Sequence, residues 1–236
     1  TPAESAKMIR DNLSNIWNQL QPSAVERYKL DLQNEPKITK DICDVADALG
    51  TKMIGLDHRI KGVGDKVAKD EHGNPIIDPE TGRPKIVCRT QEKIMQDIAE
   101  AEAKGETLTY DDCVKDINDY VRYTQACTTD NLKKNFERTV AMLEKRGYNV
   151  VKVKNFYKVD PMKNPYRGVT CVFEKDGTKF EMQFHTPQSY ASKEAQHGLY
   201  EIDRGDKGRK PSDEEHEQLQ ARMRAVATPE KVPLPR

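Results

Sequence analysis

Residues 178–186, TKFEMQFHT, carry an acid, an amide and an imidazole at every second position. Because successive side chains of a strand point to opposite faces, these three groups would share one face and leave the apolar residues on the other. The polar face would consist of Glu181, Gln183 and His185, and the apolar face of Phe180, Met182 and Phe184. A carboxylate in such company could act as a general base or hold a divalent cation. The same alternation also fits the solvated outer face of an ordinary antiparallel strand.

A second acid precedes another strand-like segment, YVRYTQA at residues 120–126. Alternation predicts two faces for this stretch, and their members are Asp119, Val121 and Tyr123 on one side and Tyr120, Arg122 and Thr124 on the other. A carboxylate at the entry of a strand and another in the middle of a nearby strand can share Mg²⁺, which prefers oxygen ligands and retains water. Asp119 is the favoured partner of Glu181, with Asp116 as the alternative acid.

The elements that must position these groups alternate between strand and helix. Residues 120–126 and 148–157 are strand-like and flank an amphipathic helix over 131–146. Strands at 167–173 and 178–186, joined by an Asp-Gly turn, form a predicted hairpin. Thr186-Pro187 then predicts the cap and first position of a helix that runs to Arg204. This order predicts an α/β fold with a mixed sheet and flanking helices.

The remaining segments are mainly helical. Residues 3–57 show three-to-four spacing, with one run through Ile9, Leu13, Ile16, Trp17 and Leu20, a second from Pro22, and a third over 42–54. Residues 71–86 predict an exposed loop or short hairpin, and helices are expected over 91–103 and 214–226, before a frayed tail. We therefore expect an N-terminal helical layer at 1–57, a core at 58–205, and a C-terminal helix and tail at 206–236.

Composition sets wider limits on the function. The 236 residues include 39 Lys+Arg and 39 Asp+Glu, so no global charge draws the chain to nucleic acid or to a membrane. No apolar run is long enough to cross a bilayer, and no signal-peptide pattern opens the chain. The five cysteines lack metal-ligand spacing and indicate buried or idle thiols. The opening Thr1-Pro2 suggests a processed chain or a part excised from a longer polypeptide.

Four segments, taken in order, resemble the motifs of RelA/SpoT-type alarmone synthetase domains. They are Arg59-Ile60-Lys61 with Lys69, Asp119 before Arg122, PYRGVT at 165–170, and FEMQFHT at 180–186. The resemblance covers roughly residues 55–205 and departs from the family pattern at Asp65, where serine is usual, at Thr170 for histidine, and at His185 for arginine. The departures resemble a divergent branch of toxic small alarmone synthetases and interbacterial effector domains. The family's hydrolase domain has no counterpart, so the resemblance implies synthesis without degradation.

This resemblance implies a nucleotidyltransferase-like synthetase fold and an ATP-dependent pyrophosphokinase. Asp119 and Glu181 would hold Mg²⁺, and Glu181 would activate a nucleotide 3′-hydroxyl. The residues expected at ATP are Arg59, Lys61, Lys69 and Arg122, although the first three also fit a solvated basic helix face. The residues expected at the acceptor are Tyr166, which would stack on the base, Gln183, His185 and His197. His185 also fits a hydrogen-bonded strand histidine.

Several alternatives stay open at this point. On the helix after residue 186, Lys193, His197, Glu201 and Arg204 fall at three-to-four spacing, which fits a plain solvated stripe or contacts to acceptor phosphates. The resemblance favours adenosine nucleotides as acceptors, followed by guanosine nucleotides, with the 3′ end of tRNA as an alternative substrate. An inactive binding module of the same fold is the rival of another class. The effector branch further implies action in the bacterial cytoplasm, delivery within a longer secreted protein, and an immunity or antitoxin partner.

Overall fold

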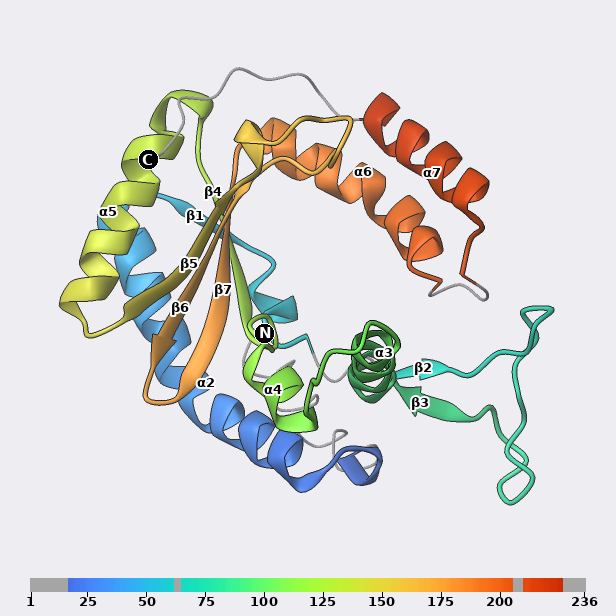
Figure 1. Cartoon of the computed structure of the whole chain (residues 1–236). Helices are drawn as coiled ribbons and strands as arrows, with labels where there is room; N and C mark the ends of the chain where they lie inside the picture. The colour runs from blue at the N-terminus through green and yellow to red at the C-terminus, as the bar shows by residue number, and fades with distance from the viewer. Residues whose placement is uncertain (1–16, 62–64, 206–209, 227–236) are drawn as a thin grey trace.

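The computed structural model describes residues 17–61, 65–205 and 210–226 (Figure 1). The predicted first helical run, through Ile9, Leu13 and Ile16, and the predicted frayed tail at 227–236 lie outside these residues. The described helices are η1 (Trp17–Gln19), α2 (Pro22–Leu49), η2 (Leu56–His58), α3 (Arg89–Ala103), α4 (Tyr110–Lys115), η3 (Thr129–Asn131), α5 (Leu132–Lys145), η4 (Phe156–Lys158), α6 (Pro187–Asp203) and α7 (Asp213–Val226). The described strands are β1 (Lys52–Ile54), β2 (Asp65–Val67), β3 (Ile86–Cys88), β4 (Arg122–Ala126), β5 (Asn149–Asn155), β6 (Val169–Lys175) and β7 (Thr178–His185).

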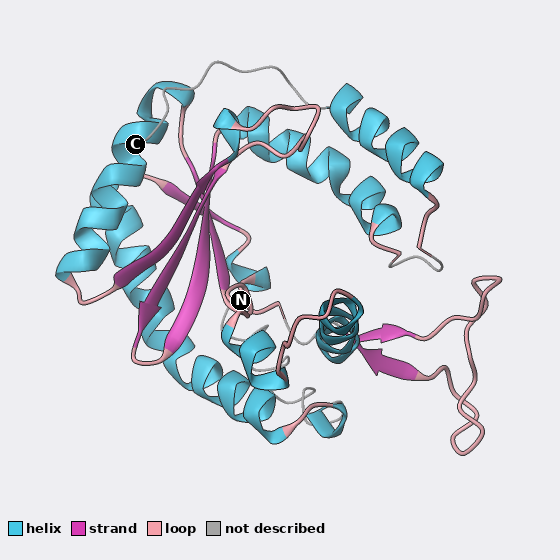
Figure 2. Ribbon diagram, in the orientation of Figure 1, coloured by secondary structure: helices cyan, strands magenta, loops and turns pink. Residues whose placement is uncertain are grey.

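Five of the strands form one mixed sheet in the order β1-β4-β7-β6-β5. β4 and β7 run parallel, whereas the pairs β1–β4, β6–β7 and β5–β6 are antiparallel. Figure 2 shows helices on both sides of this sheet, with α2 and α5 on one side and α6 and α7 on the other. The predicted α/β class, a mixed sheet with flanking helices, is confirmed. The predicted domain limits at residues 57 and 205 stay a prediction.

The main apolar core lies between the sheet and the helices α2 and α5. Phe180 of β7 makes edge-to-face contacts with Tyr123 and Tyr148, with ring centroids 5.7 and 5.6 Å apart. Phe184 packs in the same way on Phe136 of α5 at 5.0 Å. Both phenylalanines of β7 are fully buried, so the predicted apolar face of this strand is the core face. The polar face of β7 therefore points to the other side of the sheet, where α6 lies and where a site can form.

The helix α2 is one continuous element rather than separate runs. It begins at Pro22, contains Pro36, and ends where Gly50 adopts a left-handed conformation with φ 64°. Because this glycine closes the last turn, the predicted helix over 42–54 is wrong beyond Leu49. Residues 52–54 instead form β1, which pairs with β4. The sheet edge offered by β4 overrides the local helical spacing in this three-residue segment.

The predicted hairpin and the elements after it are confirmed. At the turn between β6 and β7, Asp176 and Gly177 have φ of 52° and 79°, the left-handed pair that a two-residue hairpin turn requires. The helix α6 starts at Pro187 after a capping box in which Thr186 accepts from the backbone of Ser189 and the Ser189 side chain accepts from the backbone of Thr186. The helices predicted over 91–103, 131–146 and 214–226 correspond to α3, α5 and α7.

An arm formed by β2, β3 and residues 68–85 begins beside α3 and extends away from the main sheet in Figure 1. Isolated bridges join Lys69 to Pro75 and Ile77 to Pro84, so the predicted loop or hairpin over 71–86 is a hairpin-like arm. The short helix α4 was not predicted, although Thr109 and Asp112 form its capping box. Among the described helices, none joins sufficient length to the apolar composition that a bilayer crossing requires.

Candidate functional site

The parallel pairing of β4 and β7 brings the predicted polar residues onto one face. Arg122 pairs in register with Glu181, and Thr124 with Gln183. Residues paired in this way share a face of the sheet, and this face is opposite to the one that buries Tyr123 and Phe180. The structure therefore gathers an arginine, a carboxylate and an amide on the adjacent strands β4 and β7, in the interior of the sheet.

A chain of hydrogen bonds links the carboxylate on β7 to a lysine on α6. The Gln183 side-chain nitrogen donates to Glu181 at 2.8 Å, and Lys193 donates to the Gln183 oxygen at 3.0 Å. Sequence reasoning placed Lys193 in a solvated stripe and did not assign it to the site. The helical spacing was a signal for a shared face, but only the packing of α6 on β7 shows that this face meets Gln183.

The electrostatics of this face are dominated by two neighbouring cations. Burial and, to a smaller extent, the positive charge of Arg122 lower the pKa of Lys193 to about 8, while Glu194 and Glu181 oppose the shift. A pair of neighbouring cations suits a ligand that carries negative charge.

Tyr166 is held over the same face by a histidine. Its hydroxyl lies 2.9 Å from Nε2 of His185, and its ring packs edge-to-face on Phe156 with centroids 4.9 Å apart. Nδ1 of His185 lies 2.9 Å from the Ser189 hydroxyl, at the start of α6. Gly168 permits this arrangement, because a Cβ at that residue would lie 2.8 Å from Cε1 of His185 and 3.0 Å from the Tyr166 hydroxyl.

His185 is fully buried and has a partner on each ring nitrogen. Burial lowers its pKa to about 3, and the positive charges of Lys193 and Arg122 act in the same direction. The ring is therefore neutral at physiological pH. Both ring nitrogens have partners within the protein, and the predicted contact between His185 and the acceptor stays a prediction. A hydrogen-bonded strand histidine, as in the alternative, is observed.

Asp119 lies at the edge of this face, in the loop before β4. Lys61 donates to its carboxylate at 2.5 Å, and both side chains are about 40% exposed. Burial alone would raise the pKa of the Asp119 carboxyl, but Lys61 and the charge of Arg122 outweigh burial and lower the pKa below its usual value. Arg122 thus lies close to Asp119 and is paired in register with Glu181. The alternative acid, Asp116, is exposed at the end of α4.

The predicted alternation fails at Tyr120. This side chain is buried against Tyr28 of α2, with ring centroids 4.2 Å apart, and does not share the face of Arg122. The regular strand begins only at Arg122, so the period of two does not extend back to Tyr120 and Asp119. Asp119 is therefore not confined to the face opposite Glu181, as strict alternation would require.

Three residues predicted to bind ligands lie elsewhere. Arg59 is buried in an ion pair with Glu35 of α2 and donates to the Leu56 carbonyl at 2.7 Å, which places its guanidinium on the helix side. Lys69 is exposed on the β2–β3 arm. His197 is 63% exposed on α6 and lies 3.4 Å from Glu201. The structure does not bring these three side chains to the group around Glu181.

The predicted Mg²⁺ ligands are two carboxylates. Within the described ranges, no cluster of three or more His, Cys, Asp or Glu side chains could hold a metal ion by itself. Mg²⁺ is commonly bound by one or two carboxylates and takes further ligands from substrate phosphates and water. Arg122 lies close enough to Asp119 to lower the pKa of its carboxyl and is paired in register with Glu181, so both acids lie near the same cation. Their joint role as metal ligands stays a prediction.

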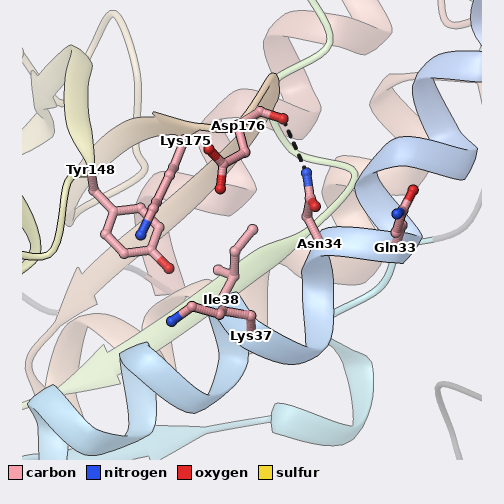
Figure 3. A pocket seen from close by; sticks show the side chains of 7 residues that line it. All are labelled: Gln33, Asn34, Lys37, Ile38, Tyr148, Lys175 and Asp176. Carbon is pink, nitrogen blue, oxygen red and sulfur yellow. Dashed lines mark hydrogen bonds between the residues drawn. The ribbon is translucent and has the colours of Figure 1, made fainter.

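A small hollow lies elsewhere, between α2 and the β6–β7 turn (Figure 3). It has a volume of about 100 Å³ and is lined by Gln33, Asn34, Lys37, Ile38, Tyr148, Lys175 and Asp176. Its polar groups bind within the protein: Asn34 donates to the Asp176 carbonyl at 3.1 Å, Lys37 to Asp41 at 3.1 Å, and Lys175 to the Arg146 carbonyl at 2.7 Å. We therefore place the candidate site at Glu181 and not in this hollow.

No protein-family model and no curated protein matches the chain. Its neighbours among solved structures include small alarmone synthetases. The chain is similar to small alarmone synthetase 2 from Bacillus subtilis, with 15% identity, a TM-score of 0.45, and coverage of 86% of this chain and 88% of that one. A GTP pyrophosphokinase family protein from Streptococcus pneumoniae gives 14% identity, a TM-score of 0.46 and coverage of 88% and 89%. Small alarmone synthetase 1 from Bacillus subtilis, bound to its product pppGpp, gives 14% identity and a TM-score of 0.39, with coverage of 87% of this chain and 85% of that one.

Proposed function

We propose that this chain transfers the β,γ-pyrophosphoryl group of ATP to the 3′-hydroxyl of a purine nucleotide. The observation that supports the proposal is the group on β4, β7 and α6: a carboxylate, Glu181, beside Arg122 and linked through Gln183 to Lys193. The four motifs that resemble RelA/SpoT-type synthetases include Glu181, Gln183 and Arg122. The proposed reaction needs both a base and cations at one point, and this face provides both.

The reaction forms one bond and breaks another at the same phosphorus. The 3′-oxygen of the acceptor attacks the β-phosphorus of ATP, its proton passes to the Glu181 carboxylate, and AMP leaves with the electrons of the broken P–O bond. Arg122 and Lys61 would pair with phosphate oxygens, whose charge must be neutralised before an anionic donor and an acceptor can approach. Asp119 and Glu181 would hold Mg²⁺, which would further neutralise the charge of the donor.

The acceptor base would lie against the ring of Tyr166. Because His185 holds the hydroxyl and Phe156 supports the ring, the orientation of this side chain is fixed before a ligand arrives. Stacking on a tyrosine is open to any base, so ring contact does not select between purines. We extend the proposal to adenosine nucleotides first and guanosine nucleotides second, and to a toxic role, on the resemblance to the effector branch.

The test is incubation of the purified chain with Mg-ATP and, separately, ADP, GDP or tRNA, with products identified by mass spectrometry. We expect AMP together with an acceptor that has gained a pyrophosphoryl group. Glu181→Gln should lower the rate by at least about 100-fold with an unchanged unfolding transition, because the variant keeps the shape and loses the base. Glu174→Gln, on β6 close to the hairpin turn, is the matched control and should keep the activity.

Each outcome separates the candidate functions. Transfer to ADP or GDP supports the proposal and identifies the purine. A product on tRNA alone would replace the nucleotide acceptor with the 3′ end of that RNA. Binding of ATP without turnover in all three mixtures would refute the enzyme and leave a binding module of the same fold.

A further inference from the structure

The amide of Gln183 lies between two side chains of opposite hydrogen-bonding character. A lysine ammonium can only donate, and an ionised carboxylate can only accept. Lys193, at 3.0 Å, must therefore face the amide oxygen, and Glu181, at 2.8 Å, must face the amide nitrogen. The chemistry of the two neighbours fixes which way the amide points, which amide geometry alone does not do.

The lysine is held in place by the surrounding structure. Its stem belongs to α6, and its ammonium lies 5.6 Å from the centre of the Tyr190 ring on the same helix. The start of α6 is joined to the end of β7 by the capping box and by the contact of Ser189 with His185. Lys193 and Gln183 are therefore two points of one rigid strand–helix unit.

We propose that Lys193 is a positioning residue that holds the Gln183 amide with its nitrogen toward Glu181, and so sets the orientation of the carboxylate for proton removal. The inference rests on the proposed function of Glu181. In the absence of the ammonium, the carboxylate still favours the amide nitrogen, but the amide oxygen loses its fixed partner and the side chain can rotate away from Glu181. Glu181 would lose a donor that holds one of its oxygens.

The kinetic test uses Lys193→Met, which keeps the length of the side chain and removes the donor. We expect kcat to fall by about 10- to 100-fold, the effect of one hydrogen bond to a charged group, with the KM for ATP unchanged. Lys193→Arg keeps a cationic donor and should restore most of the rate. Lys40→Met, which removes an exposed lysine from α2, is the control and should leave kcat unchanged.

A double-mutant cycle separates positioning from direct binding of substrate. If Lys193 acts through Gln183, Lys193→Met should cost nothing more in a Gln183→Met background. A rise in KM with unchanged kcat, or losses that multiply in the double variant, would overturn the proposal and assign Lys193 to the substrate phosphates.

A second measurement does not depend on turnover. In the ¹⁵N-labelled protein, the side-chain NH₂ of Gln183, assigned by its loss in Gln183→Met, should exchange with solvent about tenfold faster or more in Lys193→Met than in the wild type. Equal exchange in the two proteins would refute the positioning role even if the chain proves to have no transferase activity. Protection without activity would refute the proposed reaction and leave the contact standing.

Discussion

Acidification should weaken the fold through one side chain, His185. The ring is fully buried between Tyr166 and Ser189, and its pKa is lowered to about 3, with burial as the main cause. An unfolded chain restores the ordinary pKa of about 6.5. Between pH 3 and 6.5 the unfolded state therefore binds more protons than the folded state, so the free energy of unfolding falls as the pH falls.

The size of the effect follows from the two pKa values. A pH of 5 is about 1.5 units below the pKa of the histidine in the unfolded chain, so that histidine is protonated. The histidine of the folded chain is still neutral at this pH. At about 1.4 kcal/mol for each unit, His185 alone should remove about 2 kcal/mol between pH 7.5 and pH 5. This is a large share of the stability of a typical domain.

The measurement is urea unfolding at pH 7.5, 6 and 5, followed by the fluorescence of Trp17, the one tryptophan of the chain. The comparison protein is His185→Gln, which cannot titrate. Other ionisable groups are common to both chains, so the difference between the two pH-dependent losses isolates the histidine. We expect the wild type to lose about 2 kcal/mol more than the variant. Equal losses would show that His185 titrates normally and would refute the buried, neutral ring.

Two further predictions concern stability. Gly168→Ala should cost about 1–3 kcal/mol in urea unfolding, because the new methyl group would lie 2.8 Å from Cε1 of His185; an unchanged midpoint would show that the Tyr166–His185 contact is looser than described. Glu35→Ala should cost about 3–5 kcal/mol, since it leaves the Arg59 guanidinium buried without this carboxylate. Glu26→Ala, an exposed position on the same helix, serves as its control, and similar losses in both variants would contradict the buried ion pair.

The local order of elements could be read from the sequence because its signals are short in range. The Asp-Gly turn, the Thr186-Pro187 cap and the alternation along β7 each depend on neighbouring residues, and each is confirmed. The alternation also identified the face that carries Glu181 and Gln183. The strand β1 could not be predicted, since three residues carry no clear period and are stabilised by an edge supplied from β4, some 70 residues away.

The tertiary environment of the basic residues could not be read in the same way. Arg59 and Lys61 are two residues apart, yet one is buried against α2 and the other reaches Asp119. The environment of Arg59 depends on Glu35 and that of Lys61 on Asp119, and both partners are distant in sequence. For Lys193 the error runs the other way. Its helical spacing indicated a solvated residue, whereas in the structure it donates a hydrogen bond to Gln183 of β7. The environment of a charged residue is thus the hardest feature to predict from one sequence. Helical spacing does not show whether the side chain faces water or a buried partner.

The strand that carries Glu181 is hydrogen-bonded along both of its edges, to β4 on one side and to β6 on the other. A shift of its main chain would break the hydrogen bonds to both neighbouring strands at once. We therefore expect the backbone of this strand to keep its position when a substrate binds. Whatever adjustment a substrate demands must come from rotation of side chains or from elements outside this strand. Evolution of a new acceptor would then leave the strand intact and change residues on the elements around it.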